Sequence, residues 1–208
     1  MTTTTPPPLP RQSPSAGRSR RAAVLVVAVV LLLAGAGFAA WRATARDGGG
    51  PLDGRPRVSD AAAGISYGIP EGWKAGDEED LIDAFTSTVS RRMDEDGGCF
   101  VLAGRGGAVP QDRLEARAEA AARSNAEFFY PEGGSRIEES RAVEVDGRPA
   151  HTVALKVTDG EGGAAGHVRL TLVSVDDSRS AFLLGVAQPG GTQEEREVDA
   201  VLESAALL

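Results

Sequence analysis

A β-hairpin is predicted by residues 136–158, RIEESRAVEVDGRPAHTVALKVT. Apolar and polar residues alternate on both sides of the Asp-Gly pair at 146–147, a dipeptide that readily adopts the positive φ angles of a tight two-residue turn. Val153, Leu155 and Val157 share one face of the second strand, because successive side chains of a strand point to opposite sides. We therefore expect an antiparallel sheet built around this hairpin.

Further short strands are predicted on both sides of the hairpin, each bounded by turns rich in Gly, Pro or Asp. The predicted strands cover residues 65–69, 82–90, 99–103, 136–145, 150–158, 167–175 and 181–187. The segment 82–90 is ambiguous with a helix. In the last strand Phe182, Leu184 and Val186 share one face, as expected for a strand that packs on a core.

Two amphipathic helices are also predicted. The first covers residues 111–129 and has on one face Leu114, Ala118, Ala121, Ala122, Asn125 and Phe129. The second opens at Thr192, where Glu195 completes a capping box. Its apolar stripe consists of Val198, Val201, Leu202 and Ala205. This order of elements predicts an α+β fold in which an antiparallel sheet packs with helices.

A transmembrane helix is predicted at residues 22–40, AAVLVVAVVLLLAGAGFAA. The run lacks charged side chains, and at about 1.5 Å per residue it spans roughly 28 Å, close to the hydrocarbon thickness of a bilayer. Arginines precede it at positions 18, 20 and 21, so the positive-inside rule places the N-terminus in the cytoplasm. A cleaved signal peptide is the alternative, because AGA at 34–36 and ATA at 43–45 match the small-x-small cleavage pattern. Both interpretations export the C-terminal domain.

The predicted organisation is a disordered basic cytoplasmic tail at 1–21, the transmembrane helix at 22–40, a flexible linker at 41–60 and an extracytoplasmic α+β domain at 61–208. The tail has a charge of +4 without any acidic residue. From Trp41 onward the other 18 basic residues face all 30 acidic ones, a net charge of −12. Such a surface repels phosphate backbones, which excludes nucleic acid and favours basic partners or weakly held cations.

Several short motifs together resemble the PsbP-like fold, in which an antiparallel sheet lies between helices. These motifs are YGIPEGW at 67–73, the helix at 111–129, VDGRPA at 145–150 and the closing helix after PGG at 189–191. The resemblance covers nearly all of residues 62–206, and it implies a domain of the actinobacterial membrane-anchored type. Members of this fold mostly look like binding or assembly modules, and they share no catalytic motif that can be transferred to numbered positions here.

The sequence predicts no catalytic residue, no cofactor-binding residue and no metal site. His151 and His167 are interpreted as core-edge residues, and a zinc site would need three or four ligands. Cys99 lies among apolar residues and is expected to be a buried, inert thiol. DEDG at 94–97 lacks the ligand spacing of a calcium loop, and no Gly-x-Ser-x-Gly elbow occurs. GRGG at 104–107 lacks the Lys-Ser/Thr of a phosphate loop and is expected to be a flexible connection.

These observations favour a membrane-anchored extracytoplasmic binding or assembly module without catalytic activity. It would contact the membrane through residues 22–40, with an envelope protein as a candidate partner and no nucleic acid. Two alternatives stay open. One is a cell-envelope hydrolase whose site is assembled by the fold around His151 or His167, and the other is a membrane sensor that signals to residues 2–21.

Overall fold

The computed structural model describes residues 50–77, 81–92, 97–158 and 165–208. Within these residues no helix is both long enough and apolar enough to cross a bilayer. The tail at 1–21 and the transmembrane helix at 22–40 lie outside the described residues, and they stay predictions. The elements in chain order are β1 (Arg57–Asp60), β2 (Ile65–Gly68), β3 (Lys74–Ala75), β4 (Ser87–Arg92), β5 (Gly98–Gly107), the 3-10 helix η2 (Gln111–Arg113), α2 (Leu114–Phe129), β6 (Gly134–Val145), β7 (Arg148–Thr158), β8 (Gly166–Ser174), β9 (Arg179–Gln188), α3 (Thr192–Glu203) and β10 (Ala206–Leu207).

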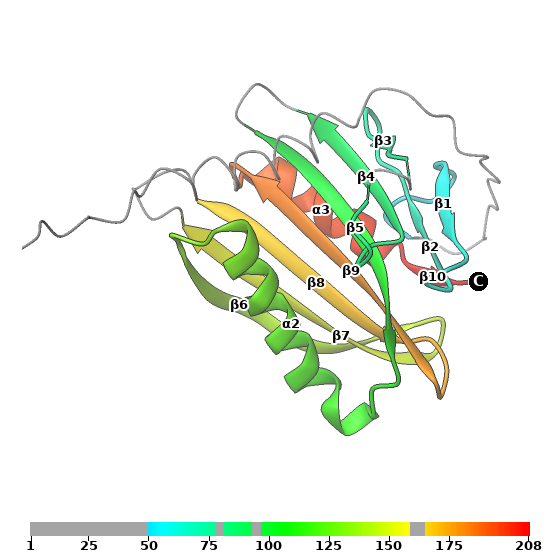
Figure 1. Ribbon diagram of the computed structural model, residues 1–208. Coiled ribbons are helices and arrows are strands. Elements are labelled where there is room, and N and C mark those ends of the chain that lie inside the picture. Colours follow the sequence, from blue (N-terminus) through cyan, green and yellow to red (C-terminus); the bar gives the residue numbers. More distant parts are fainter. Residues whose placement is uncertain (1–49, 78–80, 93–96, 159–164) are drawn as a thin grey trace, which may run out of the picture.

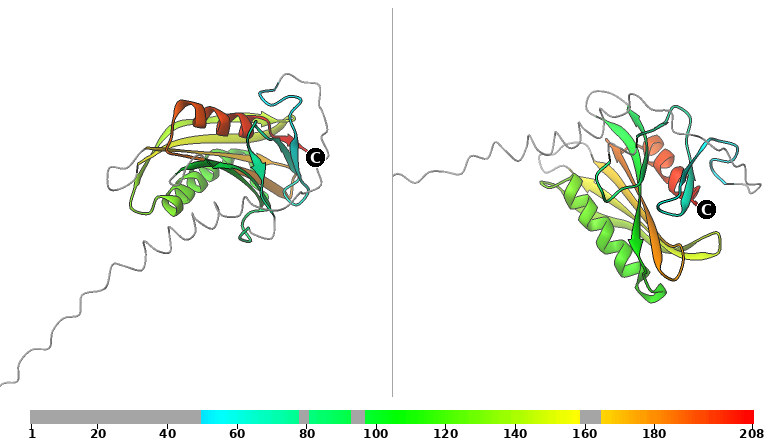
Figure 2. Two further views of the ribbon diagram at one scale, coloured as in Figure 1. Left: turned by 90° about the horizontal axis from the view of Figure 1, so that it is seen from above. Right: turned by 45° about the vertical axis from the view of Figure 1, so that its right-hand side comes forward.

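Seven strands form one antiparallel sheet in the order β3-β4-β5-β9-β8-β7-β6, and β1, β2 and β10 form a second, small sheet. The two helices cover opposite faces of the large sheet (Figures 1 and 2). Helix α2 packs on β6, β7 and β8, whereas α3 packs mainly on β9 and β5. The predicted α+β fold, with an antiparallel sheet between helices, is therefore confirmed.

Strand β9 has an apolar core on each side. Leu184 and Val186 belong to the cluster on the α2 face, which confirms the face predicted for this strand. Leu183 belongs to the other cluster, which α3 completes. Gly185 lets α3 approach closely, because an added Cβ would lie 2.3 Å from a methyl carbon of Val198. A strand buried on both faces is typical of a sheet that forms the middle layer between helices.

The predicted hairpin is confirmed. Val145 pairs with Arg148, and the two turn residues Asp146 and Gly147 have φ angles of 50° and 77°. Positive φ at both central positions is the conformation of a type I′ turn, which matches the twist of the flanking strands. The turn thereby fixes the register of the longest strand pair in the sheet.

The folded domain begins before residue 61, which corrects the end of the predicted flexible linker at 41–60. Strand β1 pairs with β2, and Asp60 is only 4% exposed. Its Oδ2 accepts hydrogen bonds from the hydroxyls of Thr86 at 2.6 Å and Ser87 at 2.5 Å, and its Oδ1 accepts one from the amide of Ala63. The strand escapes prediction because polar bonds to a distant segment, rather than an apolar alternation, hold it in place.

Two further boundaries differ from the predictions. The strand expected at 82–90 begins only at Ser87, and before it Phe85 packs edge-on against Phe182 of β9. The capping box is wrong: Gly191 is the N-cap of α3 without a side-chain hydrogen bond, so Thr192 is already helical. Glycine at this position is also a favoured N-cap, and the helix keeps its predicted apolar stripe.

Candidate functional site

His151 lies in β7 on the face covered by α2, and it is 6% exposed. Its Nε2 is 2.9 Å from the hydroxyl of Ser140 in β6. The same hydroxyl donates a hydrogen bond of 2.8 Å to a carboxylate oxygen of Glu119 in α2. The three side chains thus join the helix to the two strands beneath it.

The order of these side chains differs from that of a serine hydrolase triad. In a triad the histidine stands between the acid and the serine and accepts the serine proton. Here Ser140 stands in the middle, and its single hydroxyl hydrogen is directed at Glu119. With this assignment the ring nitrogen of His151 donates to Ser140, because a hydroxyl has one hydrogen to give. In this arrangement His151 donates to Ser140 instead of accepting its proton.

His167 lies on the opposite face of the sheet, 7% exposed beneath α3. Its Nε2 is 3.1 Å from Asp199 of α3, whose other oxygen is 2.6 Å from the guanidinium of Arg169. Burial opposes ionisation of Asp199, but the hydrogen bond from His167 and the charge of Arg169 outweigh it and lower the pKa of this carboxyl. Arg169 also pairs with Glu139 of β6. The group is an ion-pair network that connects α3 to β6 and β8.

A β-bulge in β6 makes this network possible. The register shifts between Ile137 and Glu139, so that Ile137 opposes Leu155 while Glu139 opposes Ala154. An extra residue in one strand reverses the faces of all side chains that follow it. Ile137 consequently packs on the α2 side, whereas Glu139 points to the α3 side and reaches Arg169.

The two histidines do not meet, because the sheet separates them. Among the described residues no group of three or more His, Cys, Asp and Glu side chains is arranged to hold a metal ion. Cys99 is fully buried, as predicted, and burial raises the pKa of its thiol to about 11 despite the nearby charge of Arg91. Asp94, Glu95 and Asp96 of the DEDG motif lie outside the described residues.

The predicted flexible connection at 104–107 is wrong, because these residues form the end of strand β5. Gly104 pairs with Phe182. A Cβ at Gly104 would lie 2.3 Å from the ring of Phe182 and 2.5 Å from the carbonyl oxygen of Ala84. The glycine is therefore needed for close packing rather than for mobility.

Helix α2 separates its charges between two sides. Asp112 and Glu115 line a pocket of about 610 Å³ between the start of the helix and β6–β7, which also contains Glu144. Arg113 and Arg117 line a second pocket of about 640 Å³ on the other side. We call this second pocket the arginine groove. The start of α2 thus stands between an acidic pocket and a basic one.

The arginine groove has an apolar floor, formed by Leu170 and Leu172 of β8 and Phe182 of β9. One wall is the stripe of α2 from Arg113 to Asn125, and the other is the segment from the end of β5 to Pro110. Arg105 also contributes to the lining, but strand alternation directs its side chain to the opposite face of the sheet. No acidic residue occurs among the described residues that line the groove.

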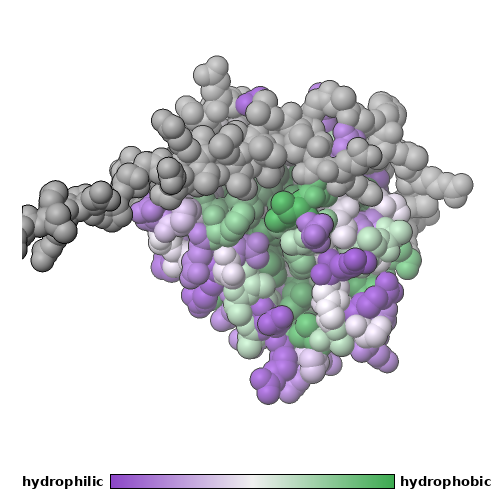
Figure 3. All heavy atoms as spheres, in the orientation of Figure 1, coloured by the Kyte–Doolittle hydropathy of each residue, from purple (hydrophilic) through white to green (hydrophobic). Residues whose placement is uncertain are grey.

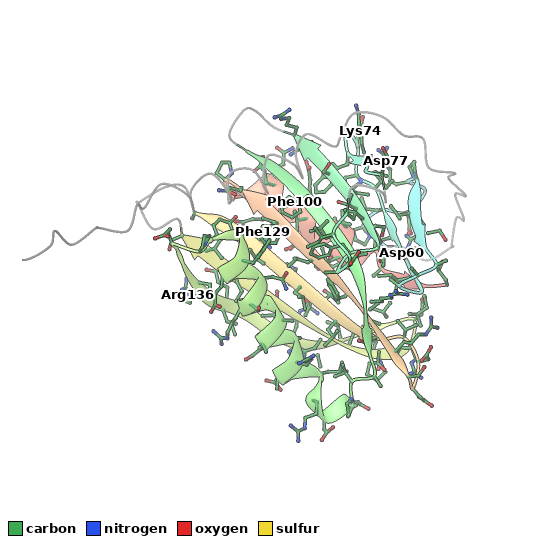
Figure 4. All side chains as sticks on the ribbon, in the orientation of Figure 1. Asp60, Lys74, Asp77, Phe100, Phe129 and Arg136 are labelled. Carbon is green, nitrogen blue, oxygen red and sulfur yellow. The ribbon has the colours of Figure 1, made fainter. Side chains whose placement is uncertain are left out.

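Helix α2 and strand β5 also meet through an aromatic contact. At the C-terminal end of the helix, the rings of Phe129 and Phe100 lie 5.4 Å apart, and Figure 4 shows them side by side. Toward the N-terminal end, hydrophobic side chains are visible in the hollow between α2 and β5, with hydrophilic ones along its sides (Figure 3). The arginines of the groove lie toward the N-terminal end of the helix, away from this aromatic contact.

The placement of these arginines is unfavourable for the helix itself. Arg113 and Arg117 are one helical turn apart, and like charges at this spacing cost about 0.2–0.5 kcal/mol. Arg113 is the N-cap of α2 and Arg117 lies in its first turn, where the positive end of the helix dipole disfavours cations. Both are exposed, and neither forms an ion pair within the described part of the chain. Residues that break a local rule without compensation are typical of functional sites. The net charge of the domain did not predict this groove. The i, i+4 spacing of the two arginines in the sequence is the signal that could have indicated it.

No protein-family model matches the sequence, and no curated protein does. Among solved structures, the domain is similar to cyanobacterial PsbP (CyanoP) from Synechocystis sp. PCC 6803, with a TM-score of 0.51 and 16% identity over 84% of this chain and 96% of that one. It is also similar to LpqN of Mycobacterium tuberculosis, described as involved in cell envelope biogenesis, with a TM-score of 0.51 and 13% identity over 69% of this chain and 82% of that one. At such identities the likeness concerns the fold alone. It confirms the resemblance found in the sequence: the folded domain of this chain has the PsbP-like fold.

Proposed function

We propose that the chain is a membrane-anchored extracytoplasmic binding module without catalytic activity, and that it binds its ligand in the arginine groove. Residues 22–40 would provide the anchor, and the PsbP-like domain would stand outside the membrane. The similarity to LpqN, an envelope biogenesis protein, supports this location without establishing it.

The groove is the observation that carries the proposal. Its volume of about 640 Å³ lies within the range of roughly 300–1,000 Å³ that is common for small-molecule sites. An apolar floor beside a few convergent polar groups is the usual composition of such sites. The arginine pair breaks the rules of helix stability, which a purely structural surface has no reason to do.

The groove also changes the expected chemistry of the partner. The net charge of −12 favours basic partners for the averaged surface of the domain. The groove presents the opposite charge locally, because the acids at the start of α2 point to the other side of the helix. A ligand recognised here would be anionic even though the domain as a whole is acidic.

A topology experiment tests the location. Leu208 is 59% exposed, so the C-terminus can carry a reporter without disturbing the core. An alkaline phosphatase fused there should be active, and a reporter that works only in the cytoplasm should be inactive. The reverse pattern would contradict the extracytoplasmic placement. Mass spectrometry of the mature chain separates the anchor from the signal-peptide alternative, since cleavage after Ala36 or Ala45 would remove most or all of residues 22–40.

Site-specific photo-crosslinking in cells tests the binding role. A benzophenone amino acid at Ser124 would lie in the wall of the groove, and the same group at Arg196 would lie on exposed α3 across the sheet. We expect a defined adduct from position 124 that is absent from position 196. Equal adducts from both positions, or none from position 124, would count against ligand binding in the groove.

The contact between Ser140 and His151 keeps the hydrolase alternative open to test. If it held a catalytic site, Ser140→Ala and His151→Ala would each abolish the cellular function. Under our proposal both variants keep that function, since neither residue lines the arginine groove. Loss of function in both, with normal folding and normal crosslinking from position 124, would favour the hydrolase.

A further inference from the structure

We propose that the arginine groove binds an amphiphilic anion, a small molecule that joins a phosphate or carboxylate group to an apolar chain or ring. This inference rests on the proposed binding function and names the ligand class of the same groove. Each part of the ligand corresponds to a separate part of the groove.

The anionic part is indicated by Arg113 and Arg117. Their guanidinium groups are exposed, lie one turn apart on the same stripe of α2 and make no ion pair within the described residues. The planar fork of arginine matches the oxygens of phosphate and carboxylate groups and binds them through paired hydrogen bonds. Arg123 and Arg169, by comparison, have acidic partners: Arg123 pairs with Glu119, and Arg169 with Asp199. Two adjacent arginines without such partners form a receptor for an anion.

The apolar part is indicated by the floor. Leu170 and Leu172 are nearly buried in the sheet, and Phe182 is partly exposed. Phe182 is further fixed by its edge-on contact with Phe85 at 6.0 Å between ring centroids. Inorganic phosphate would leave the exposed part of Phe182 in contact with water, whereas an attached chain or ring would cover it. Burial of apolar surface then adds to the contribution of the arginines.

The shape of the groove favours a small molecule over a polypeptide. The volume of about 640 Å³ corresponds to a ligand of moderate size. Every strand that forms the floor already has both neighbours in the sheet, so no free strand edge is available there for a peptide.

Calorimetry on the full-length chain in phosphatidylcholine nanodiscs tests the inference, with hexyl phosphate as the probe. Inorganic phosphate and hexanol serve as its two halves. We expect hexyl phosphate to bind at least about tenfold more tightly than either half, because only the intact probe uses both parts of the site. The heat measured with empty nanodiscs is subtracted from each titration.

Matched variants assign the binding to the groove. Arg113→Gln/Arg117→Gln should weaken the binding of hexyl phosphate by at least about tenfold, since charge-assisted hydrogen bonds are lost. Arg123→Gln/Arg196→Gln removes the same charge from exposed positions outside the groove and should leave the binding unchanged. Ser124→Trp fills the groove while keeping both arginines, and it should also weaken the binding. Unchanged melting temperatures exclude loss of folding as the cause.

The source of the anion is distinguished by a second lipid composition. If the groove reaches membrane headgroups, nanodiscs with phosphatidylglycerol will compete with hexyl phosphate and lower its apparent affinity. If the ligand is a soluble amphiphile, the affinity will be the same in both lipids. Both results support the amphiphilic anion and differ only in its source.

Three results would overturn the inference. One is equal affinity in the two double variants, and another is hexyl phosphate binding no better than inorganic phosphate. The third is tighter binding of an acidic, leucine-containing peptide than of hexyl phosphate. A specific adduct from position 124, obtained together with any of these results, would leave the binding function standing and refute only the ligand class.

Discussion

Replacing Arg169 with methionine removes a buried charge from between two carboxylates while keeping much of the side-chain volume. The arginine side chain is 6% exposed, and it pairs with Asp199 and with Glu139. In the variant both carboxylates lose this cation, and Thr152 loses the hydrogen bond that the guanidinium donates. We expect the free energy of unfolding to decrease, although the apolar volume is retained.

The exposure of the partners determines the size of the decrease. Breaking a fully buried ion pair by removing one partner costs about 3–5 kcal/mol, whereas exposed pairs contribute about 0–1 kcal/mol. The side chain of Asp199 is 27% exposed and that of Glu139 is 38% exposed, so water partly solvates both carboxylates. We therefore expect a loss of about 2–3 kcal/mol, between the two limits.

Urea unfolding of residues 50–208 provides the measurement. This fragment contains Trp73 as its only tryptophan, which is 6% exposed and donates to Glu197, so its fluorescence reports on the core. Arg136→Met is the control, because its side chain is 72% exposed and a change within about 0.5 kcal/mol is expected. Neutralising both carboxylates in the Arg169→Met background should restore most of the lost stability. A loss below about 0.5 kcal/mol for Arg169→Met would refute the reasoning.

Three further results are expected. Gly104→Ala should destabilise the domain by about 1–3 kcal/mol in the same unfolding assay, because its Cβ would overlap the ring of Phe182 and a backbone oxygen. Gly107→Ala is the control: its Cβ meets no atom within 4 Å, so the free energy of unfolding should change little. Equal effects of the two substitutions would contradict this reasoning. Cys99 should react with a thiol reagent at pH 8 only after denaturation, since it is buried and its pKa is about 11; rapid reaction of the native protein would be the contrary result. The folded-state pKa of Asp199 is lowered below its ordinary value of 3.8, so the stability it contributes is present above that value and is lost as the pH falls through the folded pKa. Below about pH 4, the free energy of unfolding should therefore fall more steeply with decreasing pH in the wild type than in Asp199→Asn. Parallel plots of this free energy against pH for the two proteins would contradict the prediction.

Elements defined by local signals were predictable from the sequence. The hairpin at 146–147 follows from the conformational freedom of an Asp-Gly pair, and the structure has the expected positive φ angles. The apolar stripes of both helices follow from the helical period, because packing against the sheet needs one apolar face. Strand β10 was missed because its partner β2 lies far away in the sequence, and β1 was missed because polar contacts with distant segments hold it in place. Arg57, for instance, donates to the carbonyl oxygen of Ser204.

The bulge in β6 shows how one residue can change a prediction about faces. Strict alternation places Ile137, Glu139 and Arg141 on the same side of the strand. The structure inserts an extra residue after Ile137, so that the two charged residues point to the other face, where Glu139 pairs with both Arg169 and Arg141. Glu138 and Glu139 are adjacent glutamates, so local sequence does not decide which of them points to the α3 face. The buried Arg169 on β8 decides this by pairing with Glu139. Local periodicity in the sequence therefore could not predict the ion-pair network.

The arginine groove exists because the two helices cover different strands. Helix α3 lies over β9 and β5, whereas α2 lies over β6 to β8 and meets β5 only near Phe129. On the α2 face this offset leaves Phe182 of β9 partly uncovered, above the buried Leu170 and Leu172 of β8. A surface selected only for solubility would place small or polar residues over such a floor, with acids at the helix N-terminus. The chain instead directs its acids away and places Arg113 and Arg117 beside the floor, an arrangement that weakens the helix and suits a ligand with a negative charge and an apolar body.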